Sequence, residues 1–156
     1  MAGQVEKRLA ALGIELPQAG APAGNYVPTI FAGGLLFLSG QLCGWNGERR
    51  FIGRVGRELS IEQGQQAARL CGLNIIAHLK NALGELDRVA RCVRLSGFVR
   101  ATDDFPDHAK VLNGCSDLMV DVFGEAGWHT RVAVGANGLP YGMAVEIESI
   151  FEVRPA

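Results

Sequence analysis

Several features that identify common protein classes are absent from this chain of 156 residues. The cysteines and histidines are scattered singly, with no C-x-x-C pair: Cys43, Cys71, Cys92 and Cys115, with His78, His108 and His129. Zinc sites need more closely spaced ligands, so we predict no metal site. We also find no dinucleotide fingerprint and no phosphate-binding Gly-Lys loop, and therefore expect no cofactor.

An excess of either charge is missing too. The chain has 15 basic and 16 acidic residues, for a formal net charge of −1. No whole-molecule field would attract nucleic acid or an acidic membrane. Arg91, Arg94 and Arg100 fall in or beside one predicted strand, but no aromatic stacking residues interleave with them. A nucleic-acid partner is therefore not expected, and these arginines fit a solvated or subunit-facing strand better.

Long apolar runs are absent as well. No stretch approaches the roughly 20 apolar residues needed to cross a bilayer, so we expect no membrane span. No charged-then-apolar leader opens the sequence, and we expect a cytoplasmic protein with reduced thiols. Hydrophobic residues make up 48% of the chain, which suits one domain over residues 1–156.

Periodicity and turn residues predict most of the secondary structure. A short amphipathic helix is predicted at about residues 4–12, followed by a Pro- and Gly-rich linker at about 13–25. Gly33-Gly34 indicates a hairpin between strands 29–32 and 35–38. Further along the chain we expect a turn at 45–48, short strand 51–55, helix 60–83, strand 89–99 and helix 106–123.

Particular residues mark the ends of the two long helices. Ser60 and Gln63 form the pattern of a capping box, and Gly84 is placed to end the first helix. Residues 102–105 supply N-cap candidates for the second helix, which Gly124 and Gly127 would close. His78 lies on the apolar stripe of the first helix, so we interpret it as a buried or interface histidine.

The C-terminal stretch offers a catalytic pair. Residues 131–136 and 145–153 alternate in character around a Gly/Asn/Pro turn, and we expect them to pair as antiparallel strands. Arg131 could then grip a carboxylate with two parallel N–H bonds, while Glu146 exchanges a proton beside it. A structural ion pair between Arg131 and Glu146 is the alternative.

The order of elements indicates the fold class. Two long amphipathic helices alternate with strands, and a mixed sheet with both helices packed on one face is the simplest way to bury their apolar stripes. The sequence therefore predicts an α+β protein.

Three motifs carry a family resemblance. Thr130-Arg131, followed after Leu139-Pro140 by the segment 145–148, resembles the C-terminal signature of the Rid/YjgF family of reactive-intermediate deaminases, also described as endoribonuclease L-PSP-like. The segments 24–27 and 38–41 resemble two upstream family motifs in the expected order. The resemblance spans about residues 26–153.

The resemblance implies a chorismate mutase-like fold, assembled as a homotrimer with each site in a cleft between subunits. It implies hydrolysis of 2-imino or enamine acids to 2-oxo acids and ammonia. Arg131 matches the arginine that binds the substrate carboxylate, and Glu146 the glutamate that orients or activates water.

The remaining site positions also come from the resemblance. Tyr26 matches a tyrosine lining the cleft, and Ser39 a serine near the substrate or its protons. Asn113 resembles an asparagine in the second long helix. Ala133 stands where close relatives often have cysteine, a position whose backbone carbonyl could hold water.

Two other functions compete with imine hydrolysis. The same cleft could bind a 2-oxo acid or a related carboxylate without catalysis. An endoribonuclease is the third candidate, but the near-neutral charge and the lack of both an aromatic track and a paired-histidine motif disfavour it.

Overall fold

A computed structural model describes residues 2–156. Three helices are present: α1 (Gln4–Ala11), α2 (Ile61–Leu83) and α3 (His108–Phe123). The main sheet has the strand order β1-β2-β7-β5-β6, formed by β1 (Thr29–Ala32), β2 (Leu35–Leu42), β7 (Val145–Val153), β5 (Val89–Arg100) and β6 (Thr130–Ala136). A separate hairpin pairs β3 (Gly44–Trp45) with β4 (Glu48–Arg49). Short 3-10 turns occupy η1 (Leu86–Arg88), η2 (Gly124–Gly127) and η3 (Pro140–Gly142).

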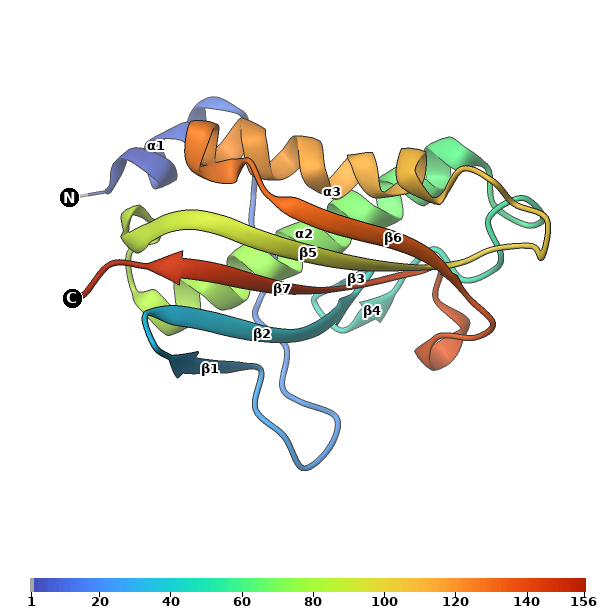
Figure 1. The fold of residues 1–156 in the computed structure, drawn as a ribbon, viewed down its shortest axis with the longest axis horizontal. Coiled ribbons are helices and arrows are strands. Elements are labelled where there is room, and N and C mark those ends of the chain that lie inside the picture. Colours follow the sequence, from blue (N-terminus) through green and yellow to red (C-terminus); the bar gives the residue numbers. More distant parts are fainter. Residues whose placement is uncertain (1) are drawn as a thin grey trace.

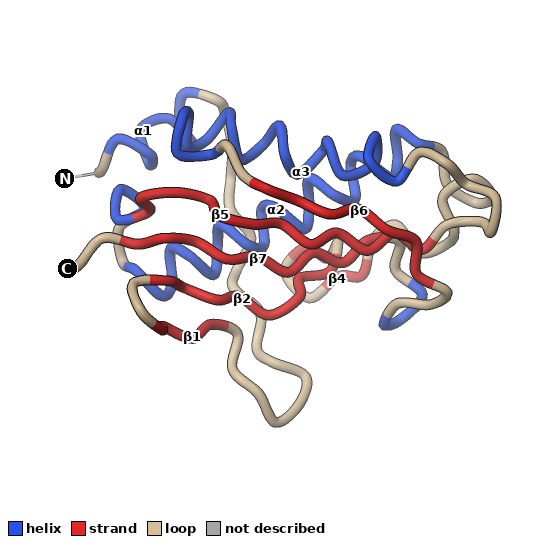
Figure 2. Tube along the Cα trace, in the orientation of Figure 1, coloured by secondary structure: helices blue, strands red, loops and turns tan. Residues whose placement is uncertain are grey.

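Both long helices cover one face of the mixed sheet, which confirms the predicted α+β fold (Figures 1 and 2). The predicted capping box is present at the start of α2, where Gln63 N donates to Ser60 Oγ at 3.1 Å and Ser60 N donates to Gln63 Oε1 at 2.9 Å. Gly84 ends α2 with a φ of 77°, a conformation that favours glycine. Within residues 2–156, no helix has the length and apolar character needed to cross a membrane.

The predicted pairing of the two C-terminal strands is wrong. β6 pairs in parallel with β5, whereas β7 pairs antiparallel with both β5 and β2, so β5 lies between them. The crossover from β5 through α3 places β6 at the edge of the sheet, and the turn after β6 then passes β5 to reach β7. Hydrophobic alternation predicted both strands but could not identify their partners.

Two other local predictions are also wrong. Residues 51–55 form no strand but only isolated bridges, because their backbone bonds are divided between two segments. Gly53 N donates to Gly142 O and Ala144 N donates to Phe51 O, whereas Val55 N donates to Arg100 O. Helix α3 begins at His108 with Asp107 as its N-cap, and no side chain caps it. The acidic residues before it therefore do not act as the predicted cap.

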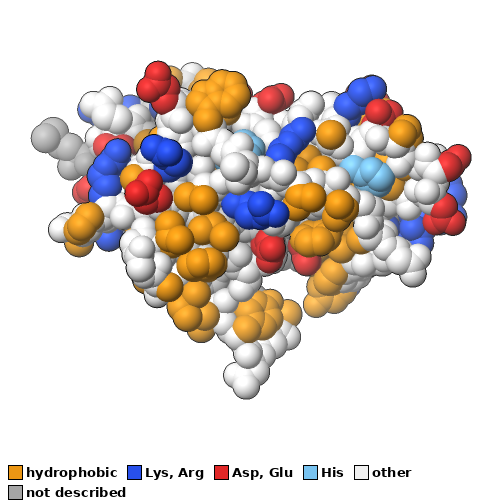
Figure 3. All heavy atoms as spheres, in the orientation of Figure 1, with side chains coloured by type: hydrophobic (Ala, Val, Ile, Leu, Met, Phe, Trp, Pro, Cys, Tyr) orange, Lys and Arg blue, Asp and Glu red, His pale blue; other side chains and the backbone are white. Residues whose placement is uncertain are grey.

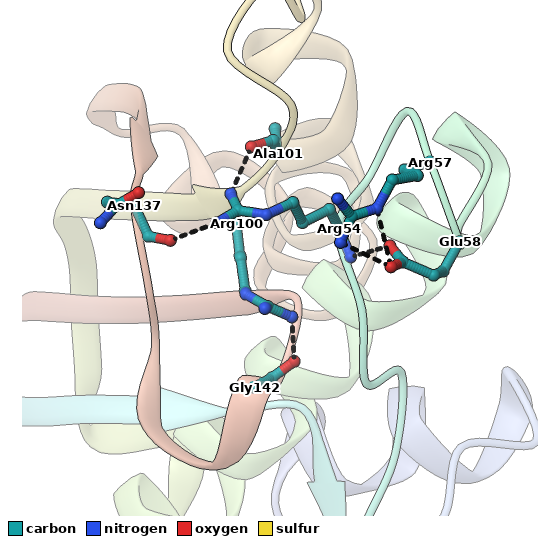
Figure 4. A network of polar contacts seen from close by, with 7 residues as sticks. All are labelled: Arg54, Arg57, Glu58, Arg100, Ala101, Asn137 and Gly142. Atoms are coloured by element: carbon teal, nitrogen blue, oxygen red, sulfur yellow. Dashed lines mark hydrogen bonds and ion pairs between the residues drawn. The ribbon is translucent and has the colours of Figure 1, made fainter.

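The connection between β6 and β7 is held by two arginines (Figure 4). Arg54 donates to Ala101 O at 2.9 Å and to Asn137 O at 2.8 Å. Arg100 donates to Gly142 O at 3.1 Å. These bonds satisfy loop carbonyls and fix the segment that carries Tyr141, whose backbone has a positive φ of 60°.

Helix α1 is attached to η1 and α2 through acidic side chains. The carboxylate of Asp87 accepts hydrogen bonds from Gln4 N and Val5 N, each at 2.8 Å, and so caps the first turn of α1. Glu6 Oε1 accepts from Lys80 Nζ at 2.6 Å and from Leu86 N at 3.0 Å. The pKa values of Asp87 and Glu6 both lie below the ordinary range.

The face of the sheet opposite the helices carries exposed apolar side chains. Strand register places Phe37, Val132 and Val134 on this open face, together with Ile30 beside Phe37. Their side chains are between 37% and 59% exposed. Hydrophobic side chains also gather over β1 and β2 in the view of Figure 3. Such an apolar face is typical of a surface that another chain covers.

We predict that Gly114→Ala destabilises the protein. A methyl group at this position of α3 would fall on the backbone carbonyl of Gln65 in α2. Alanine gains about 1 kcal/mol of helix propensity over glycine, but separating two packed helices costs roughly 1–3 kcal/mol or more, so the clash dominates. Urea unfolding should measure the loss. Gly138→Ala is the control, since its methyl group would meet no atom within 4 Å; equal stability of both variants would contradict this packing.

Candidate active site

Arg131 lies on β6 and points toward α3. Its register partner in β5 is the fully buried Leu95, which places the arginine on the helix-covered face. The guanidinium Nη1 donates to Asn113 Oδ1 at 2.9 Å and to Ser116 Oγ at 3.1 Å, and Nη2 donates to Ala109 O at 3.3 Å. Its Nε–H has no partner among residues 2–156, so a fixed cation keeps donors for a ligand.

Ser116 and His129 extend this network. His129 Nδ1 lies 2.6 Å from Gly127 O, a carbonyl that can only accept, so we assign the ring proton to Nδ1. In the neutral ring, Nε2 then accepts from the Ser116 hydroxyl at 2.9 Å. The serine oxygen is thereby oriented to accept from Arg131. The sequence prediction did not include this series of hydrogen bonds, although His129 stands only two positions before Arg131.

A cavity of about 520 Å³ opens beside this network. It is lined by Asn113, Ser116, Asp117, Val120, Asp121, Trp128, His129 and Arg131. The predicted site residues Asn113 and Arg131 therefore share one cavity wall. Ala133, two positions after Arg131 on β6, is partly buried against the core.

Glu146 lies on the other face of the sheet. Its register partner in β5 is Phe98, three positions from the partner of Arg131, and successive strand residues alternate between faces. The carboxylate is half-buried beside Gly40, where an added Cβ would lie 2.9 Å from Glu146 Oε1. Burial, reinforced by the charge of Glu148, raises the pKa of Glu146.

Tyr26 and Ser39 are brought near Glu146 through Gly40. Ser39 directly precedes this glycine, and its hydroxyl donates to Val27 O at 2.8 Å, which ties the end of β2 to the loop carrying Tyr26. The Tyr26 hydroxyl accepts from Ala23 N at 3.3 Å, and its ring is half-exposed. Tyr26 and Gly40 line a second cavity, of about 340 Å³.

The predicted site residues thus form two groups in one chain. Arg131 and Asn113 meet on the helix side of the edge strand, whereas Glu146 lies near Tyr26 and Ser39 across the sheet. Arg131 and Glu146 form no ion pair within residues 2–156, so the two residues are not a structural pair inside one chain. Over the same residues, no three His, Cys, Asp or Glu side chains gather closely enough to hold a metal.

The sequence profile of the YjgF/chorismate mutase-like family, whose members are described provisionally as endoribonucleases, matches residues 6–148. The chain belongs to this family. The shared region includes both groups of site residues, and the YjgF-like fold agrees with the observed mixed sheet and paired helices.

The chain is similar to three known proteins over most of their length. Protein TCP17 of Trypanosoma cruzi is 44% identical over 97% of this chain and 96% of its own length. A structure from Shewanella oneidensis MR-1, classed provisionally as an endoribonuclease, is 36% identical with a TM-score of 0.94, covering 97% of this chain and 100% of that one. RidA from an Antarctic Psychrobacter is 29% identical with a TM-score of 0.59, covering 87% and 94% of the two chains.

We predict that Glu146→Gln raises the stability of this YjgF-family protein in a pH-dependent manner. Because the folded-state pKa of Glu146 is raised, ionised Glu146 destabilises the fold above that pKa, and the cost vanishes at low pH where the carboxyl group is protonated in both states. The melting temperature should rise by a few degrees at about pH 8 and match wild type at about pH 3.5. A gain of the same size at both pH values would show that ionisation is not its cause.

Proposed function

We propose that this protein hydrolyses reactive 2-imino and enamine acids to 2-oxo acids and ammonia. The observation that carries the proposal is the combination of a rigidly held arginine with spare donors and a half-buried carboxylate of raised pKa. A bidentate cation suits a small carboxylate substrate, and a strengthened base suits the activation of water. The membership of this chain in the YjgF family and its likeness to a protein named RidA support the same chemistry.

The complete site forms between copies of the chain. Arg131 and Glu146 face opposite sides of the sheet, so one chain cannot present both to a small molecule. The exposed apolar residues on the open face favour its burial by another copy. We propose a closed homotrimer in which Arg131 of one copy meets Glu146, Tyr26 and Ser39 of the next.

The reaction then requires only groups supplied by the chain. Arg131, held by Asn113, binds the substrate carboxylate. Glu146 takes a proton from water as the water oxygen attacks the imine carbon, and it passes this proton to the nitrogen as the C=N double bond opens, which leaves a carbinolamine. Glu146 then takes the hydroxyl proton and passes it to the amine nitrogen, so that the C–N bond breaks and ammonia leaves as the carbonyl forms.

The other site residues assist these steps. The backbone carbonyl of Ala133 holds the attacking water. Ser39 takes part in the proton transfers, and Tyr26 lines the cleft between the two copies. The imine is already electrophilic, so the reaction needs no cofactor or metal.

We predict that Arg131→Lys lowers kcat/KM for imine hydrolysis by roughly 100-fold while the protein stays folded, because an ammonium group cannot reproduce the guanidinium fork. Ammonia release from freshly generated imines measures the effect. Arg57→Lys is the matched control, since Arg57 is exposed and its guanidinium pairs with the neighbouring Glu58. Wild-type turnover by the Arg131 variant would exclude bidentate binding of the substrate carboxylate by Arg131.

Mixing inactive variants tests whether the site is shared. Arg131→Ala and Glu146→Gln chains, dissociated and reassembled in equal amounts, should recover about one quarter of wild-type activity. Half of the subunits keep Arg131 and half keep Glu146, so about one shared site in four receives both intact residues. Each variant reassembled alone should remain inactive. No recovery in mixed trimers, confirmed by mass, would place both residues in a site within one chain.

The same assays separate the competing functions. Tight binding of 2-oxo acids without faster imine hydrolysis would identify a carboxylate-binding module. RNA cleavage that is abolished by Glu146→Gln would identify an endoribonuclease.

A further inference from the structure

Arg131 uses only part of its hydrogen-bonding capacity within the chain. A guanidinium carries five N–H donors. Nη1 makes two hydrogen bonds, to Asn113 Oδ1 and Ser116 Oγ, and Nη2 makes one, to Ala109 O. The N–H of Nε and one N–H of Nη2 have no partner among residues 2–156. These two nitrogens share one edge of the planar group, and such an edge can hold a carboxylate through two parallel bonds.

The charge of Arg131 has no partner in the chain either. None of the ion pairs among residues 2–156 includes this arginine. Asp117 and Asp121 line the same 520 Å³ cavity, but neither forms an ion pair with Arg131. The side chain is partly buried, so its cation is less well hydrated than one on the open surface. A small anion that enters this cavity therefore finds an unpaired cation with two free donors.

The hydroxyl group of Ser116 is oriented by His129. A hydroxyl has a single proton, and His129 Nε2, at 2.9 Å, accepts it. The lone pairs of the serine oxygen then face Arg131 Nη1 at 3.1 Å. If the proton turned toward Nη1 instead, two donors would meet and this hydrogen bond would be lost. His129 therefore decides whether Ser116 can hold the guanidinium.

His129 is itself held against α3. Its Nδ1 lies 2.6 Å from Gly127 O, at the end of the turn η2. Gly127 is buried, and a Cβ added there would fall on the carbonyl oxygen of Met119 in α3. The turn thus packs directly on the backbone of the helix that also carries Ser116. One rigid unit supplies both the histidine and the serine, which limits the reorganisation needed to bind a ligand at Arg131.

We propose that His129, acting through Ser116, is a positioning residue that fixes Nη1 of Arg131 and so presents the edge formed by Nε and Nη2 to the substrate carboxylate. This inference rests on the proposed deaminase function. His129 and Ser116 take no part in the bond changes and act only through Arg131. Because the carboxylate is bound alike in the substrate and in the transition state, their loss should weaken binding rather than slow the chemistry.

The kinetic test separates KM from kcat. His129→Leu and Ser116→Ala should each raise KM for imine hydrolysis by roughly tenfold and change kcat by less than about twofold. The double variant should lose no more than either single variant, because both changes break the same series of hydrogen bonds. A fall in kcat at unchanged KM, or additive losses in the double variant, would overturn the proposal. Ser116→Ala keeps the test valid if His129→Leu does not fold.

A conservative variant and a matched control sharpen this test. His129→Gln should retain most of the wild-type affinity, since the amide oxygen of glutamine can accept from Ser116 as Nε2 does. His108→Leu is the control, because His108 also lies on α3 or its neighbouring turn but lines neither cavity. It should keep the wild-type KM. An equal rise in KM in the His108 variant would show a general loosening of α3 and would contradict the specific role of His129.

A binding test needs no turnover. Pyruvate, a small 2-oxo acid, is titrated into the assembled protein by calorimetry, and its Kd should rise by roughly tenfold in His129→Leu and Ser116→Ala. In protein with ¹⁵N-labelled arginine, pyruvate should shift the Nε–H signal of Arg131, which is assigned by its absence from Arg131→Lys. No binding of pyruvate by wild type, or binding that leaves this signal unmoved, would overturn the proposal.

The two tests distinguish this proposal from the deaminase hypothesis. If wild type hydrolyses no imine but His129→Leu and Ser116→Ala weaken pyruvate binding as expected, the deaminase proposal fails and the positioning role stands. If imines are hydrolysed and both variants bind pyruvate as tightly as wild type, the positioning proposal fails alone.

Discussion

The close approach of α3 to its neighbours is the constraint on which the site depends. At Gly97 of β5, a side chain would collide with Leu112 of α3, and at Gly114 it would collide with the backbone of α2. These two glycines let α3 lie low on the sheet and against α2 at the same time. Asn113 directly precedes the second glycine and Ser116 follows it by two positions, and this depth allows both to reach the guanidinium of Arg131. Packing at residues without side chains thus positions the cation.

Local signals in the sequence predicted the elements well. The capping box at Ser60, the stop at Gly84 and the hairpin at Gly33-Gly34 depend on a few adjacent residues, and each occurs as expected. The segment 51–55 was predicted wrongly because distant backbone groups decide its conformation, whereas α3 starts later than predicted because Phe105 N donates to Thr102 O in a local turn before it. The partners of β6 and β7 were missed for the same reason, since alternation reports which face is buried but not which strand lies alongside.

The candidate site shows a similar division. Resemblance to a family indicated Arg131, Asn113 and Glu146, and the structure adds the hydrogen bond between the first two and the half-buried position of the third. Ser116 and His129 could not be identified from sequence, because their roles depend on contacts between segments. His78 on an apolar stripe was correctly expected to be buried.

The attachment of α1 has a consequence for how the protein responds to acid. Asp87 and Glu6 hold this helix as carboxylates, and their lowered pKa values mean that this stabilisation is present above the unfolded pKa and lost as the pH falls through the folded one. Beneath them, the core consists mainly of apolar side chains that do not titrate in this range. Acid should therefore loosen the chain from its N-terminal end first: backbone amides of α1 would exchange with solvent while those of β5 and β7 remain protected.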